Sequence, residues 1–139
     1  MSDDTPTADE VWAQLTRLVL YGRDPWRRAA VERTGLPFSR IRVLRRLQAA
    51  PLTVKELAHA AAIDAPAATV AVNDLEERGL VVREVDPTNR RRKQVSLTAD
   101  GRAILAEALA TPDPAPTSVA ALDEAELRTL HEILRKLEH

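Results

Sequence analysis

Hydrophobic residues recur every three or four positions over most of the chain, the spacing that places them on one face of a helix. The first such stripe starts at about residue 8 and contains Val11, Leu15, Leu18 and Val19. Asp24 followed by Pro25 predicts an N-cap and a proline in the first turn, so we expect a break near Gly22 and a second helical piece ending at Gly35. A further helix, capped by Ser39, is expected to carry a stripe of Ile41, Leu44 and Leu47.

Two helix start signals follow each other closely in the middle of the chain. Thr53 and Glu56 have the spacing of a capping box, in which each side chain satisfies a free N–H of the first turn. Asp64 can cap a second helix, and Gly79 suits the left-handed position after its end. Two short helices joined by a tight turn are typical of a helix-turn-helix.

After Gly79 the pattern changes from helix to strand. Residues 80–85 are apolar and rich in β-branched side chains, residues 86–89 read Asp-Pro-Thr-Asn, and residues 94–97 can return as a second strand. The run Arg90, Arg91, Arg92 and Lys93 lies between them. The pattern therefore predicts a β-hairpin with a basic tip.

Two more helices are expected beyond the hairpin. Thr98 can cap one that ends before the prolines at 112, 114 and 116. Asp123 and Glu126 mark the start of the last helix, whose leucines at 127, 130, 134 and 137 form the narrow stripe of a helix packed along another helix. One small lobe cannot cover both terminal helices, so we expect a homodimer. The predicted fold class is mostly α (α+β).

Composition and charge narrow the function. The chain has 139 residues, no cysteine and a net charge of −1, which excludes disulfides and thiolate chemistry and leaves no overall attraction to nucleic acid. Basic residues are nevertheless concentrated, because residues 23–46 hold eight arginines against Asp24 and Glu32. No apolar stretch is long enough for a signal peptide or a membrane span, so we expect a cytoplasmic protein without membrane contact.

No enzymatic or metal-binding constellation is found. His59, His131 and His139 lack the spacing of metal ligands with each other or with a carboxylate. The acids at 123, 124 and 126 begin a helix, where exposed N–H groups favour negative charge. We therefore expect no catalytic residues, no metal and no cofactor.

Three segments carry a resemblance to a known family: residues 75–81 (LEERGLV), 86–91 (DPTNRR) and 95–102 (VSLTADGR). In this order, and followed by the last helix, they resemble the MarR family of bacterial winged helix-turn-helix transcription regulators. The likeness spans nearly the whole chain. It implies one domain over 1–139, with dimerisation helices at 8–34 and 119–139, a winged helix-turn-helix lobe at 37–98 and a connecting helix at 98–110.

The resemblance also implies a function. A family member binds a pseudo-palindromic operator in double-stranded DNA as a homodimer, with the second short helix in the major groove and the wing residue Arg91 in the minor groove. Many relatives are repressors that a small aromatic or phenolic ligand releases from DNA. This chain departs from the family pattern with Val70 and Asp74 where Arg is frequent, with Asn73 where an Asp often braces the wing arginine, and with the prolines of residues 111–118.

The expected DNA-binding residues lie on the two short helices and the wing. They are Thr53, Lys55, Ala65, Ala67, Thr69, Val70, Asn73, Arg90, Arg91, Arg92 and Lys93. Thr69 and Asn73 suit base contacts at A and T. The alternative for the residues on the second short helix is an ordinary solvent-exposed surface, and the alternative for the run 90–93 is a solvated basic turn. The arginines at 40, 42, 45 and 46 can either meet phosphate or pair with nearby acids.

Two further hypotheses remain open. Trp12, Trp26 and Arg27 are the candidate ligand-binding residues, with core or interface packing as the alternative for the tryptophans. The rival to a DNA-binding regulator is a winged-helix protein-interaction module that has lost DNA binding. It is motivated by the acids Asp64, Asp74, Glu76 and Glu77 near the groove-facing helix.

Overall fold

A computed structural model describes residues 4–138, so that residues 1–3 and His139 lie outside the described residues. The chain divides into two compact units, one made of Met1–Gly22 with Pro112–His139 and the other of Arg23–Thr111. From the sequence, residues 8–34 were expected to form dimerisation helices. In the structure, the helix Asp24–Thr34 belongs to the second unit.

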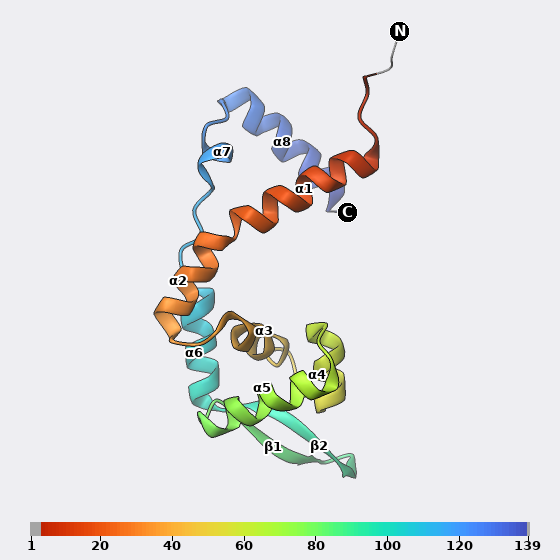
Figure 1. The fold of residues 1–139 in the computed structure, drawn as a ribbon, viewed down its shortest axis with the longest axis vertical. Helices are drawn as coiled ribbons and strands as arrows, with labels where there is room; N and C mark the ends of the chain where they lie inside the picture. Colours follow the sequence, from red (N-terminus) through yellow and green to blue (C-terminus); the bar gives the residue numbers. More distant parts are fainter. Residues whose placement is uncertain (1–3, 139) are drawn as a thin grey trace. The chain divides into compact units, whose positions relative to one another are not determined.

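The first unit holds helices from both ends of the chain. They are α1 (Ala8–Gly22), the short α7 (Thr117–Ala120) and α8 (Glu124–Leu137) (Figure 1). Helix α8 begins with the expected capping box, in which Asp123 Oδ1 accepts from the Glu126 N–H at 2.8 Å and the Asp123 N–H donates to Glu126 Oε1 at 3.0 Å. Neither α1 nor α8 has a buried residue, so their apolar faces are left open.

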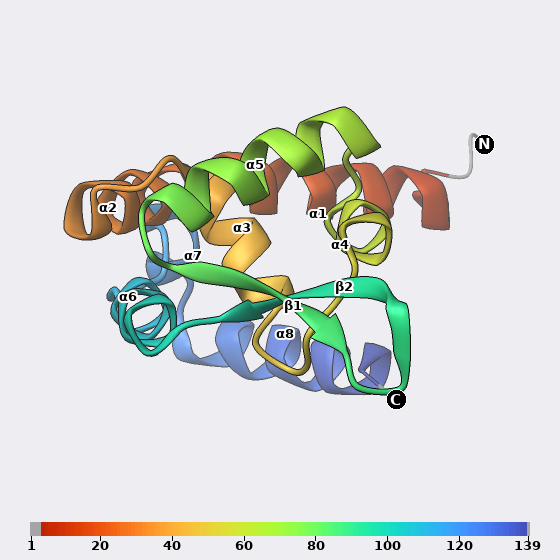
Figure 2. The ribbon, with the colours of Figure 1, turned by 90° about the horizontal axis from the view of Figure 1, so that it is seen from below.

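The second unit is a small lobe of helices with a two-stranded hairpin. Its elements are α2 (Asp24–Thr34), α3 (Phe38–Arg46), α4 (Val54–Ala61), α5 (Ala65–Glu77), β1 (Val81–Asp86), β2 (Asn89–Leu97) and α6 (Ala99–Leu109). The strands pair antiparallel, and Figure 2 shows α5 alongside them. None of the described helices combines the length and apolar character that a bilayer span requires.

One hydrophobic core joins these elements. Leu44 of α3, Leu57 of α4 and Leu75 of α5 are completely buried together with Val81 and Val95 of the hairpin. Burial of each such side chain contributes about 1.5 to 3 kcal/mol to folding. Leu52, two residues before α4, also joins the hairpin, because Leu52 and Val95 exchange two backbone hydrogen bonds of 3.1 and 2.7 Å. The helix-turn-helix and the wing are therefore one packed body.

Three local expectations were wrong in detail. Asp24 does not cap α2, because the preceding Arg23 is already in the helical region and no extended cap residue exists. Ser39 lies inside α3, whose N-cap position is Pro37. The second strand begins at Asn89 rather than at 94, so the run from Arg90 to Lys93 belongs to a strand and not to the turn.

Candidate nucleic-acid interface

Helices α4 and α5 are positioned by caps that the sequence predicted. Thr53 Oγ1 accepts from the Glu56 N–H at 3.1 Å, and Glu56 Oε1 accepts from the Thr53 N–H at 3.0 Å. Ala62 adopts the left-handed conformation between the helices, with φ of 56°. Asp64 Oδ1 then accepts from the Ala67 N–H at 2.7 Å and starts α5. These local bonds confirm the expected helix-turn-helix.

Helix α5 has a buried and an exposed face. Ala68, Ala71, Val72 and Leu75 are buried, whereas Ala65, Ala67, Thr69, Val70 and Asn73 are exposed. The Thr69 hydroxyl donates to the Ala65 carbonyl at 3.0 Å, so its oxygen can still accept a hydrogen bond. The exposed face is short, small and nearly uncharged, so it can approach another surface closely.

Asn73 is held by a strand residue that the sequence did not single out. Arg83 of β1 donates to Asn73 Oδ1 at 2.6 Å and to Glu76 Oε1 at 2.8 Å. One guanidinium thus ties the base of the wing to α5. No local signal in the sequence could name these partners, because they lie on another element.

Asp74 is also part of a bridge between elements. It accepts from Arg40 Nε of α3 at 2.8 Å and from Arg78 Nε at 3.1 Å. These hydrogen bonds, the one from Arg40 first, hold the pKa of Asp74 below its ordinary value. Arg40 therefore forms an ion pair, the second of its two expected roles.

The turn of the hairpin is organised by one buried carboxylate. Asp86 accepts from the Thr88 hydroxyl at 2.7 Å and from the Thr88 N–H at 2.8 Å, and Gln94 approaches its other oxygen at 3.4 Å. The bonds from Thr88 hold the pKa of Asp86 below its ordinary value. A register shift between Val85 and Asp86 bends the hairpin at the same place.

The four wing cations do not share one environment. Arg92 pairs with Glu56 of the α4 capping box at 2.9 Å. The pKa of Glu56 lies below its ordinary value, chiefly because of the Thr53 hydrogen bonds and to a smaller extent because of Arg92. Arg90, Arg91 and Lys93 are exposed and form no ion pair with any described residue. Lys55, on the first turn of α4, is likewise exposed.

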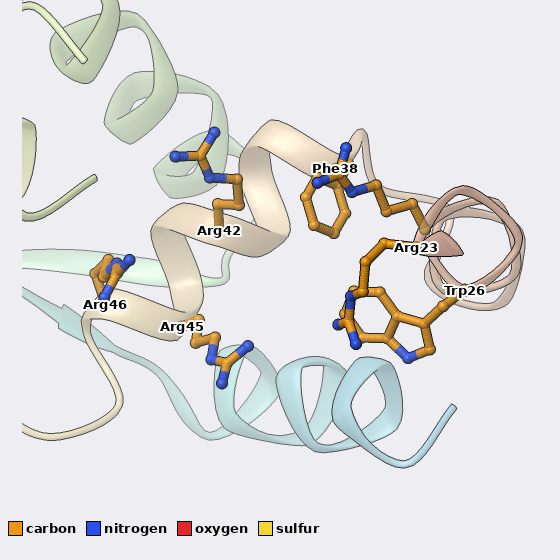
Figure 3. Close-up of a pocket in the computed structure, with 7 residues that line it drawn as sticks. Arg23, Trp26, Phe38, Arg42, Arg45 and Arg46 are labelled. Atoms are coloured by element: carbon orange, nitrogen blue, oxygen red, sulfur yellow. The ribbon is translucent and has the colours of Figure 1, made fainter. Parts of the chain in front are cut away.

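Beside this surface the lobe contains a cavity of about 560 Å³. It is lined by Arg23, Trp26, Arg27, Phe38, Arg42, Arg45 and Arg46 (Figure 3). The buried Trp26 ring meets Phe38 edge-to-face at 5.8 Å, and the Trp26 Nε1–H donates to the Thr111 carbonyl at 3.3 Å. Of the candidate ligand-binding residues, Trp26 and Arg27 line this cavity, whereas Trp12 is an exposed residue of α1.

Comparison with known proteins finds relatives both by sequence and by structure. The MarR family profile matches residues 34–92. A protein of Thauera aromatica named "Putative transcriptional regulatory protein for hcr operon" is 37% identical over 89 residues, which are 62% of this chain and 52% of that protein. The aligned region therefore spans about half the length of that relative.

Solved structures extend the likeness in fold. Apo MarR from E. coli superposes with a TM-score of 0.71 at 23% identity over 90% of this chain and 95% of MarR. An S. aureus MepR mutant bound to an oligodeoxyribonucleotide superposes with a TM-score of 0.61 at 22% identity, over 91% of this chain and 94% of MepR. The MarR family profile thus matches the segment that contains α3, α4, α5 and β1, and the structures agree with this chain in fold along most of its length.

Proposed function

We propose that this protein is a sequence-specific transcriptional repressor that binds a pseudo-palindromic operator in double-stranded DNA as a homodimer and is released by a small aromatic ligand. The observation that supports it best is an exposed, uncharged face on α5 beside three exposed wing cations that form no ion pair with any described residue. A recognition helix enters the major groove, and cations beside it are attracted to phosphate. Such a protein acts in the cytoplasm, where bacterial DNA lies.

The charge distribution on the lobe favours DNA over a protein partner. The acids that motivated the protein-interaction hypothesis are largely used within the lobe, since Asp64 caps α5, Asp74 binds two arginines and Glu76 binds Arg83. Acids neutralised in this way repel a DNA backbone less than free acids would. The cations Arg90, Arg91 and Lys93 remain available on the wing.

The terminal helices support the homodimer. Trp12 and Tyr21 of α1 are 70% and 75% exposed, and Leu137 of α8 is 64% exposed. Large apolar side chains at such exposure, on helices without a buried residue, are typical of a surface that another chain covers. We assign Trp12 to this interface, and Trp26 and Arg27 to the ligand site.

The wing is tested by Arg91→Ala, with Arg102→Ala on the first turn of α6 as the matched exposed control. If Arg91 enters the minor groove, its loss weakens binding to the promoter of the protein's own gene by about 1 to 3 kcal/mol. It also flattens the plot of log K against log salt by roughly one unit. Fluorescence anisotropy at several salt concentrations measures both. Identical curves for the two variants would remove the wing from the mechanism.

The dimeric mode of binding is tested on the DNA itself. A two-fold dimer presents its recognition helices to two half-sites about one helical turn apart. Inserting about five base pairs between the half-sites rotates one of them to the opposite face and should abolish tight binding, while an insertion of about ten restores the face. Affinity that is independent of spacing would contradict binding by a rigid dimer.

Repression is tested with a reporter gene under the same promoter. Reporter transcription that falls when the gene for this protein is deleted would contradict repression.

A further inference from the structure

Asn73 carries an amide on the exposed face of α5, the helix that the proposed function assigns to the major groove. A free asparagine side chain has an oxygen that accepts hydrogen bonds and an NH₂ group that donates them. With both groups free it pairs with adenine, accepting from the N6 amino group and donating to N7. The base that Asn73 reads therefore depends on which of these two groups is free.

The oxygen of this amide is engaged by Arg83. Nη2 of Arg83 donates to Asn73 Oδ1 at 2.6 Å, a short hydrogen bond from a charged donor. A guanidinium has donors and no acceptor, so the amide atom beside it is the oxygen and the amide cannot be turned round. The NH₂ group of Asn73 forms no hydrogen bond with any described residue. Asn73 thus keeps its donors while its acceptor is occupied.

Arg83 is itself fixed from two sides. It lies within β1, where it pairs with the buried Val95 of β2, and its side chain is only 25% exposed. Its other terminal nitrogen donates to Glu76 Oε1 at 2.8 Å. Asn73 and Glu76 are three residues apart on α5, so one guanidinium fork holds two neighbouring positions of the helix. Release of the Asn73 oxygen would break a charge-assisted hydrogen bond between the strand and the helix.

An amide with only its donors free matches a different base. In the major groove guanine presents two acceptors, O6 and N7, and no donor, whereas adenine presents N7 beside its amino group. The second lone pair of the Asn73 oxygen lies beside the Arg83 donors, which repel a further donor such as that amino group. Adenine would therefore leave its amino group unpaired at the interface, which is costly.

We propose that Arg83 is a positioning residue for base recognition: by engaging the Asn73 oxygen it makes Asn73 select guanine, where the residue type alone favours adenine. This inference rests on the proposed function, because it names the base that the recognition helix reads. Asn73 donates to the O6 and N7 edge of guanine, and Arg83 acts through Asn73 without contacting that base.

Selection from a pool of random DNA duplexes by the full-length protein, followed by sequencing of the bound DNA, gives the preferred site. Repeating the selection with Asn73→Ala identifies the base pair that Asn73 reads, since the preference should be lost there. Fluorescence anisotropy then measures affinity for four duplexes that differ only at this base pair. Wild type should bind the duplex with guanine about tenfold more tightly than the duplex with adenine.

Two variants separate positioning from structural support. Arg83→Met removes the guanidinium and frees the Asn73 oxygen, so the tenfold preference for guanine should disappear or turn toward adenine. Glu76→Gln is the matched control, because it removes the charge of the other partner while Arg83 still donates to Asn73. Its affinity should change by the same factor for all four duplexes, so that the preference for guanine remains.

A third variant covers the case in which circular dichroism shows that Arg83→Met does not fold. Asn73→Asp keeps an acceptor for Arg83 and removes the donors, so the preference for guanine should be lost in a folded protein. A preference for guanine that persists in Asn73→Asp overturns the inference.

The outcomes also distinguish this inference from the proposed function. A wild-type protein that prefers adenine at the Asn73 position, or an Asn73→Ala protein with unchanged preference at every position, overturns the inference and leaves sequence-specific DNA binding in place. An Arg83→Met protein that binds all four duplexes more weakly by the same factor shows structural support alone and also overturns it. A wild-type protein that enriches no sequence overturns the proposed function and the inference together.

Discussion

Gly101, at the start of α6, is the position where one methyl group should cost the most. A Cβ there would lie 2.0 Å from the Leu80 carbonyl oxygen and 3.0 Å from the Leu80 carbonyl carbon. Both atoms belong to the backbone, and the same oxygen accepts from the Thr98 N–H at 3.1 Å. No side-chain rotation can relieve the contact, so Gly101→Ala must move α6 away from the hairpin.

The size of the effect follows from two opposing contributions. Overpacking typically destabilises by about 1 to 3 kcal/mol, and a contact this short with backbone places it at the upper end. Replacement of glycine by alanine within a helix returns up to about 1 kcal/mol. We expect a net loss of about 2 kcal/mol, which lowers the melting temperature of a lobe of this size by roughly 8 to 16 °C.

Circular dichroism during heating, together with urea titration, measures this difference. Gly22→Ala is the matched control, because its Cβ would meet nothing closer than Pro116 Cγ at 3.7 Å, an ordinary contact. The control should change stability by less than about 0.5 kcal/mol. A Gly101→Ala protein that melts within a degree of the wild type would refute the close approach of α6 to the hairpin.

Three further predictions concern the caps, the pH dependence and the dimer. Thr53→Ala removes the hydroxyl that accepts from the Glu56 N–H and should destabilise the lobe by about 1 kcal/mol in urea titration, whereas Thr53→Ser should be nearly neutral. Asp74 has a lowered pKa because Arg40 donates to it, so the ionised carboxylate stabilises the folded protein fully at neutral pH. The difference in unfolding free energy between wild type and Asp74→Asn should therefore shrink as the pH falls below about 4. A difference that stays constant with pH would argue against the ion pair. Leu134→Glu places a charge on the apolar stripe of α8 and should yield monomers in sedimentation experiments, with a persisting dimer showing that α8 lies outside the interface.

Several elements could be predicted from the sequence because their stabilising bonds are local. The capping boxes at Thr53 and Asp123 and the cap at Asp64 each satisfy an N–H three residues further along the chain. The left-handed Gly79, with φ of 76°, likewise follows from a residue type alone. These bonds are why the order of these helices was predicted correctly, whereas the four-residue helix α7 (Thr117–Ala120) was not predicted.

The details that failed depend on neighbouring elements. Asp24 is not a cap because α1 and α2 follow each other through a helical Arg23. The early start of β2 depends on the pairing of Asn89 with Asp86, and residues 90–92 lie in the register shift between that pair and the pair of Val85 with Lys93. Local residue preference carries no information on such pairing between strands.

The sequence by itself determined the helix-turn-helix, the hairpin and the presence of a basic wing, since hydrogen bonds and hydrophobic spacing within short segments specify them. Only the tertiary structure decided which charges are free. Arg83 of β1 donates a hydrogen bond to Asn73 of α5, and Arg92 of β2 forms an ion pair with Glu56 of α4. Arg91 stays exposed. The sequence shows the arginines of residues 23–46, but the cavity that five of them line forms only when α2 and α3 pack against each other.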